Sequence, residues 1–301
     1  MRIAFLLALC ALPALTETLP VPAGLDAYMP VPASNPLTKE KAALGKRLFF
    51  DNRLSADGTI SCASCHDPKQ AFTIRDSVAT GIGHQRGTRK PPRLLNRGYG
   101  RAFFWDGRAR TLEEQVLQPI GNPVEMGSNP EDAARRAGVT VPEMQNALAT
   151  YLRTILSGDS PYDRFMGGNA SVLNETQKEG LRLFTGKAGC SGCHLGPNFT
   201  DEKYHNTGIG TTDRGRFEVT HVEADRGAFR TPGLREAART PPYMHDGSLA
   251  TLEDVVDFYD KGGRANPGLD RDIRPLHLSA DEKKALAAFL GALNGTVRDG
   301  F

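Results

Sequence analysis

The sequence lacks several features that define other protein classes. Its 301 residues include only five cysteines and one tryptophan, and the net charge is +2 at pH 7. So few cysteines exclude a disulfide-dense scaffold, and no run of basic residues indicates nucleic acid binding. The apolar run from Ile3 to Leu15 is too short for the roughly 20 residues of a membrane-spanning helix. We therefore do not expect an integral membrane protein.

The amino terminus has the pattern of an export signal. Arg2 precedes the apolar run from Ile3 to Leu15, and small or polar residues follow it. We expect residues 1–18 to be a secretory signal peptide and the protein to be periplasmic. Cys10 lies inside this segment, and Leu9 before it fits a lipoprotein cleavage site poorly. Four cysteines then remain in the exported chain.

Those four cysteines form two C-x-x-C-H motifs, which are typical of c-type haem attachment. A disulfide pair or a four-cysteine zinc site would leave unexplained the histidine that follows each motif. We therefore predict two covalently attached c-type haems, with the two histidines as proximal iron ligands. The motifs comprise Cys62, Cys65 and His66 in the first half and Cys190, Cys193 and His194 in the second.

The segments around the two motifs repeat one another, which indicates an internal duplication. The paired segments are Thr38–Phe50 with Thr176–Thr185, Trp105–Pro119 with His245–Tyr259, and Pro142–Leu156 with Ser279–Leu293. We expect a Thr to open each helix of the first pair, and Thr111 and Thr251 to cap the middle pair. Glu114 would complete a capping box, and Asp254 a looser acidic version of it. The sequence predicts a mainly α protein of two tandem cytochrome-c-like domains, residues 19–165 and 166–301.

One position breaks the repeat. Leu252, Val255, Val256 and Tyr259 stand at i, i+3, i+4 and i+7, so Tyr259 lies on the buried stripe of its helix. The equivalent residue is Pro119, whose side chain cannot bind iron. We interpret Tyr259 as an oxygen ligand that closes the second haem, while the first stays open; the alternative is a structural tyrosine.

An open haem with a suitable distal pocket would be catalytic. Gln115 shares the helical face of Pro119, and Glu125 follows shortly after. An acidic residue near the iron could move a proton between the two oxygens of peroxide, although Glu125 could equally be a surface glutamate. Trp105 is either a core residue or an oxidisable relay between the haems.

Four segments carry a resemblance to a known family. They read LFFDNRLSADGTISCASCHDPKQAFT, FWDGRARTLEEQ, NPVEMG and PYMHDGSLATLEDVVDFY, and they resemble the bacterial di-haem cytochrome c peroxidases over nearly the whole exported chain. The resemblance implies that the N-terminal haem is peroxidatic, with Gln115 and Glu125 as distal catalytic residues and Trp105 between the haems. A tyrosine at position 259, and the YHNTG segment from Tyr204, are similar to the MauG branch, whose namesake oxidises a precursor protein to build a tryptophan-derived quinone.

The chain also departs from this family. MauG has a tryptophan two residues before the second haem motif, where this sequence has Ala188. His84 stands near the place of a histidine that blocks the first haem in ordinary peroxidases, so it is either a distal ligand or a solvent-facing loop residue. Thr240 and Pro242 match a segment whose carbonyls bind calcium in the family, but the partner asparagine reads Lys90. A cation beside calcium is unfavourable.

We expect a periplasmic di-haem peroxidase that reduces hydrogen peroxide at the His66 haem. The oxidising equivalents would be shared with the His194 haem through Trp105. The electrons would come from a small redox protein, such as a cytochrome c or a cupredoxin, or from a protein substrate. The alternative is a non-catalytic di-haem electron carrier, which requires both irons to be six-coordinate.

Overall fold

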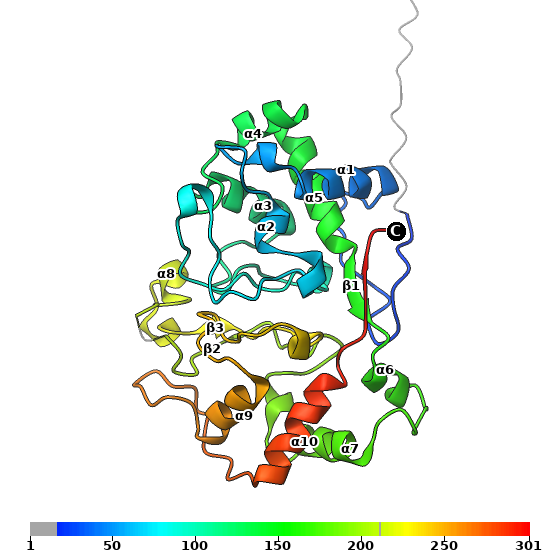
Figure 1. Cartoon of the computed structure of the whole chain (residues 1–301), viewed down its shortest axis with the longest axis vertical. Coiled ribbons are helices and arrows are strands. Elements are labelled where there is room, and N and C mark those ends of the chain that lie inside the picture. The colour runs from blue at the N-terminus through cyan, green and yellow to red at the C-terminus, as the bar shows by residue number, and fades with distance from the viewer. Residues whose placement is uncertain (1–16, 211) are drawn as a thin grey trace, which may run out of the picture.

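The computed structural model describes residues 17–210 and 212–301, so almost all of the predicted signal peptide, with Cys10, lies outside the described residues. Helices dominate, as predicted, and two helical groups lie one above the other with β2 and β3 between them (Figure 1). No helix in the described part of the chain is long and apolar enough to cross a membrane. The first group contains α1 (Lys39–Phe49), α2 (Cys62–Cys65), α3 (Leu112–Gly121), α4 (Pro130–Ala137) and α5 (Val141–Arg153). The second contains α6 (Pro161–Met166), α7 (Glu175–Thr185), α8 (Phe217–Thr220), α9 (Leu252–Asp260) and α10 (Ala280–Gly291).

The helix starts follow the predicted caps with one exception. The hydroxyls of Thr38, Thr111 and Thr251 accept main-chain hydrogen bonds at the starts of α1, α3 and α9. The prediction that a Thr opens α7 was wrong, because Asn174 is the cap and Thr176 lies inside the helix. The Asn174 side chain accepts from the main-chain amide of Gln177, and the Gln177 side chain accepts from the main-chain amide of Asn174, which completes a capping box.

At the starts of α3 and α9 the capping boxes differ from our expectation, because the box of α9 is closed and that of α3 is not. Asp254 Oδ2 accepts from the Thr251 amide at 2.9 Å, and the Thr251 hydroxyl accepts from the Asp254 amide at 3.0 Å, so the box that we expected to be looser is closed. In α3 the carboxylate of Glu114 instead accepts from the amide of Arg110 at 2.8 Å. A glutamate can also close such a box, as Glu143 does at α5 and Glu282 at α10, so side-chain length does not explain the different bond of Glu114.

The same helix crossing occurs in both halves. A Cβ added at Gly45 of α1 would lie 1.9 Å from the carbonyl oxygen of Ala147 in α5. A Cβ added at Gly180 of α7 would lie 2.0 Å from the carbonyl oxygen of Ala285 in α10. Glycine is required at both crossings because the two helix backbones touch there.

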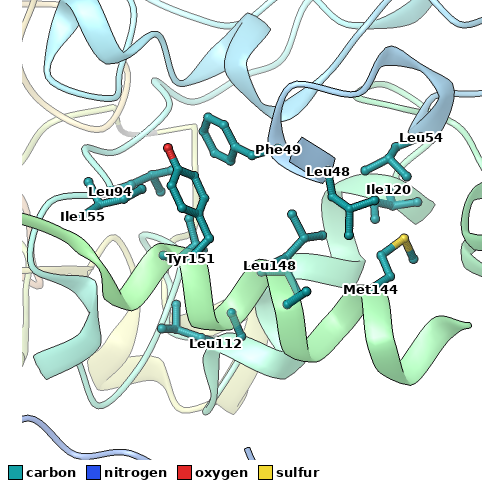
Figure 2. Packing of buried hydrophobic residues seen from close by; sticks show 14 of the residues in the cluster. Leu48, Phe49, Leu54, Leu94, Leu112, Ile120, Met144, Leu148, Tyr151 and Ile155 are labelled. Atoms are coloured by element: carbon teal, nitrogen blue, oxygen red, sulfur yellow. The ribbon is translucent and has the colours of Figure 1, made fainter. Parts of the chain in front are cut away.

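Aromatic pairs extend this equivalence into the two cores. Phe49 and Tyr151, each four residues beyond a crossing residue, have ring centroids 5.2 Å apart in the first core (Figure 2). Phe184 and Phe289 hold the matching places in the second core at 5.1 Å. Each half therefore builds its own core around one helix pair.

The carboxyl terminus returns to the first half. β4 (Thr296–Asp299) pairs antiparallel with β1 (Ile155–Gly158), and Val297 packs against the first core. The predicted helix Pro142–Leu156 is therefore too long, since its last residues belong to β1. A second short ladder joins β2 (Tyr204–His205) to β3 (Phe229–Arg230). The domain limits 19–165 and 166–301 stay a prediction.

Candidate haem sites and the boundary between them

Both motif histidines are held in the same way. His66 Nδ1 lies 3.1 Å from the carbonyl oxygen of Phe72, and His194 Nδ1 lies 2.9 Å from that of Phe199. A ring whose Nδ1–H donates to a carbonyl presents its Nε2 lone pair, which is the arrangement of a metal-binding histidine. Burial lowers the pKa of His66 to about 4 and lowers the pKa of His194 as well, so both rings are neutral.

The four motif cysteines are free thiols that are partly buried. Burial raises the pKa of Cys62 to about 12 and those of Cys65 and Cys190 to about 11. No group of potential metal ligands among the described residues joins cysteines of both motifs, which leaves the four-cysteine zinc reading without support. Unpaired, buried C-x-x-C thiols beside a neutral histidine suit thioether attachment of haem.

A large cavity lies beside the second motif. Its volume is about 1270 Å³, and its lining includes all three motif residues together with Leu252, Val255 and Tyr259 of α9. The structure thus brings Tyr259 to the same cavity as His194, on the helical stripe that the sequence indicated. Burial raises the pKa of Tyr259, and the nearby Cys190 and Cys193 add to the effect. A ferric iron would reverse this shift, because metal binding deprotonates a phenol.

The half-buried Arg93 supports the fit of an anionic cofactor to the second cavity. Its guanidinium donates to the Thr240 hydroxyl at 2.6 Å and to the Gly233 carbonyl, both neutral oxygens. Burial lowers the pKa of Arg93 to about 10, since no carboxylate bonds to it directly. Arg93 lines the cavity that also contains His194. A haem propionate would supply the missing negative charge.

The first motif faces an acidic group. Glu125 follows α3, and its carboxylate accepts from the Asn122 amide at 2.8 Å. Burial raises the pKa of Glu125, while the charge of Arg108 opposes the shift. The negative charge of Glu125 contributes to the raised pKa of both Cys62 and Cys65, so the carboxylate lies near the point of haem attachment.

Helix α3 packs into the same core as the first motif, because Leu112, Val116 and Ile120 belong to the cluster that Cys62 contacts. Pro119 lies inside this helix, and the half-buried Gln115 lies one turn before it. A proline and an amide leave no side chain that competes strongly for iron at this helix. Gln115, Pro119 and Glu125 lie on one short segment, and the joint role of these residues at the first haem stays a prediction.

Trp105 lies at the boundary between the halves. Its indole Nε1 donates to the carbonyl of Lys90 at 2.8 Å, and its side chain lines the large cavity. His84, in contrast, is exposed at the end of a single 3₁₀ turn with φ 59°. Ala188, which replaces the tryptophan of MauG, is buried and lines the cavity.

The residues that would hold calcium do not fit that ion. Lys90 is 6% exposed, and its ammonium donates to the carbonyls of Ile74 at 2.5 Å and Asp76 at 3.2 Å. Thr240 is hydrogen-bonded to the guanidinium of Arg93. The charges of Lys90 and Arg93 repel a divalent ion at this place.

No sequence pattern indicated the surroundings of Arg93 or the ammonium bonds of Lys90, but the internal repeat did contain a signal for His245. In the internal alignment His245 occupies the position of Trp105, and the two rings meet with centroids 6.4 Å apart.

Comparisons with known proteins agree on one family. The family model described as "Di-haem cytochrome c peroxidase" matches residues 39–138. The chain is 42% identical over 286 residues to the methylamine utilization protein MauG of Methylorubrum extorquens, covering 88% of this chain and 81% of that protein. It is 36% identical over 304 residues to the cytochrome c551 peroxidase of Nitrosomonas europaea, covering 93% and 87%.

A solved structure gives the same result. A MauG-like protein associated with microbial copper homeostasis matches with a TM-score of 0.81 and 32% identity, covering 94% of this chain and 95% of that one. Each of these matches covers at least 88% of this chain. The chain therefore belongs to the MauG-like di-haem cytochrome c peroxidases, a family of peroxidase-type oxidoreductases that carry haem.

Proposed function

We propose that this chain is a periplasmic enzyme that reduces hydrogen peroxide at a c-type haem held by Cys62, Cys65 and His66. The second motif and Tyr259 would hold a second c-type haem, which would supply a place to store part of the oxidising equivalents. Haem iron, when bound, supplies the site where peroxide coordinates and the electrons that cleave it. The electrons are replaced by a small redox protein or by a protein substrate oxidised at the surface.

The different surroundings of the two motifs carry this proposal. At the first motif, Glu125 can take a proton from one oxygen of peroxide and return it to the other, since its carboxyl is partly buried and its pKa is raised. The side-chain amide of Gln115 can donate a hydrogen bond in the same pocket. Pro119 leaves the coordination position free.

At the second motif the equivalent helix instead supplies a phenol. Tyr259 lines the cavity beside His194, and an anionic phenolate would stabilise the more oxidised iron. Trp105 lies at the boundary between the two halves, where an electron can pass through its indole. The second site would thus store and pass on charge rather than bind peroxide.

The decisive experiment adds one equivalent of peroxide to the fully oxidised holoprotein and records its absorption and electron paramagnetic resonance spectra. The proposal expects one high-spin and one low-spin ferric haem at rest, and rapid changes at both haems after peroxide. Two low-spin haems that do not react would instead identify an electron carrier without catalysis.

A further inference from the structure

The boundary between the halves contains two copies of the same turn. In residues 103–109 and 243–249 the amide of the first residue donates to the carbonyl of the last, at 2.9 Å and 2.7 Å. Gly107 and Gly247 occupy the same place in these turns, with φ of 69° and 67°. Trp105 and His245 are therefore equivalent in three dimensions as well as in sequence.

The two equivalent side chains meet. The Trp105 and His245 rings have centroids 6.4 Å apart and an interplanar angle of 67°, which is an edge-to-face arrangement. The main chain of Lys90 holds both residues, because its amide donates to the His245 carbonyl at 2.7 Å while its carbonyl accepts from the Trp105 indole. The contact is thus set by a hydrogen-bonded frame that spans the boundary.

His245 has an unusual environment for a structural histidine. Its side chain is 4% exposed, stacks on Phe229 with centroids 3.5 Å apart, and its Nε2 has no hydrogen-bond partner among the described residues. Burial lowers the pKa of His245 to about 4, against the opposing charges of Asp246 and Asp213. A buried polar atom without a partner costs free energy, so packing alone would favour an apolar ring here.

A neutral ring is what an oxidised tryptophan requires. In the proposed relay, Trp105 gives one electron to the site at Cys62–His66 and later receives one from the site at Cys190–His194. Between these two steps the indole carries a positive charge. The indole N–H donates to a carbonyl, which cannot accept the proton, so the charge stays on the ring. A neutral aromatic neighbour can stabilise that charge, whereas a protonated imidazole would repel it.

We propose that His245 is a positioning residue for the relay: as a neutral ring, it holds Trp105 and lowers the cost of oxidising it. The relay is then a pair of residues, one from each copy of the duplicated turn. This inference rests on the proposed function, which supplies the peroxide that withdraws the electrons.

The test compares His245→Leu, His245→Phe, Trp105→Phe and the double variant Trp105→Phe/His245→Leu, each as holoprotein with both haems. One equivalent of peroxide is mixed with the oxidised protein in a stopped-flow instrument. The spectral change of the first haem and that of the second are followed separately. Haem content and Tm report folding, and His245→Gln replaces the leucine variant where leucine lowers haem content.

We expect the His245→Leu variant to react with peroxide at the first haem at the wild-type rate. Oxidation of its second haem should be about tenfold slower, which corresponds to ~1.4 kcal/mol of activation free energy. His245→Phe should restore most of that rate, since it keeps a neutral ring. The double variant should be no slower than Trp105→Phe, because His245 acts through the indole.

Two results would overturn the role of His245. One is second-haem oxidation within about twofold of wild type in the leucine or glutamine variant, and the other is full additivity in the double variant. A wild-type protein whose first haem ignores peroxide would instead contradict the proposed function, so the two failures are distinguishable.

Discussion

The two halves of the molecule share a scaffold and differ in what faces each haem motif. Both cross their helices at a glycine, pair two aromatic rings beside the crossing, and bond the motif histidine to a carbonyl. The difference lies in the helix after the D-G turn, which presents Pro119 in one half and Tyr259 in the other. The two halves therefore share the surroundings of the motif histidine and differ in the side chain that this helix presents.

The electrostatic surroundings differ in the same direction. The first site has a partly buried carboxylate, Glu125, beside the attachment cysteines. The second has a partly buried guanidinium, Arg93, bonded only to neutral oxygens. Proton transfer needs the first arrangement, whereas holding an anionic cofactor with a fixed ligand suits the second.

The largest expected effect comes from removing the acid at the first site. Glu125→Gln should keep both haems but slow the reaction with peroxide by roughly 10²–10⁴-fold, the usual cost of a lost acid–base group. If the carboxylate is the proton acceptor, the wild-type rate should rise with pH through a pKa above 4.5, because burial raises it. The variant should lose this rise. Stopped-flow mixing over a pH series measures both.

A matched control is Glu131→Gln, since Glu131 is exposed at the start of α4. It should react as the wild type does. An unchanged rate in Glu125→Gln would remove Glu125 from the mechanism and weaken the contrast between the two sites.

The next effect concerns Tyr259, the proposed iron ligand by which the second half differs from the first. Tyr259→His should keep a six-coordinate second haem but replace an anionic oxygen by a neutral nitrogen, which makes higher oxidation states harder to reach. Peroxide should still react at the first haem, while oxidation of the second falls about tenfold or more. Absorption and Mössbauer spectra of the peroxide-treated protein follow this directly.

Tyr243→Phe is the control, because Tyr243 lines the same cavity and donates to the carbonyl of Ala237. It should leave the second haem unchanged. If Tyr259→His also leaves the resting and peroxide-treated spectra unchanged, Tyr259 is a core residue.

The sequence predicted the local features well and the distant ones poorly. The two haem motifs, most helix caps and the Tyr259 stripe could be read because each signal lies within about ten residues. The pairing of β1 with β4 joins segments about 140 residues apart, and no local sequence pattern indicates it. The uncompensated charge of Arg93 and the contact of Trp105 with His245 likewise depend on how the halves dock.

A smaller effect tests whether the two helix crossings are equivalent in energy. Gly45→Ala and Gly180→Ala should each lower the free energy of unfolding by roughly 1–3 kcal/mol, since the new Cβ would overlap a carbonyl oxygen. Gly291→Ala, where a Cβ meets nothing within 4 Å, serves as the control. Denaturant unfolding of the holoprotein measures all three. A cost confined to one crossing would show that the halves are not equally packed.

His84 should have little effect on the first site. Its side chain is exposed, so the oxidised enzyme should react with peroxide at once, without prior addition of an electron. His84→Gly should change that rate by less than about twofold, since an exposed side chain away from the reacting atoms contributes little. A wild-type enzyme that stays inert until one electron is added, and a glycine variant that does not, would make His84 a lock on the first haem.

The smallest expected effect is that of removing divalent metal from the boundary between the halves. Lys90 already supplies a positive charge there, with its ammonium bonded to the carbonyls of Ile74 and Asp76. A chelator should therefore leave the Tm and the peroxide reaction of the wild type unchanged. Lys90→Met leaves those carbonyls without a donor, at a cost of about 1–3 kcal/mol, and should lower the Tm equally with and without chelator. A wild-type Tm that falls on chelation and recovers with calcium would show that the ammonium does not replace the ion, and that the boundary is metal-bound after all.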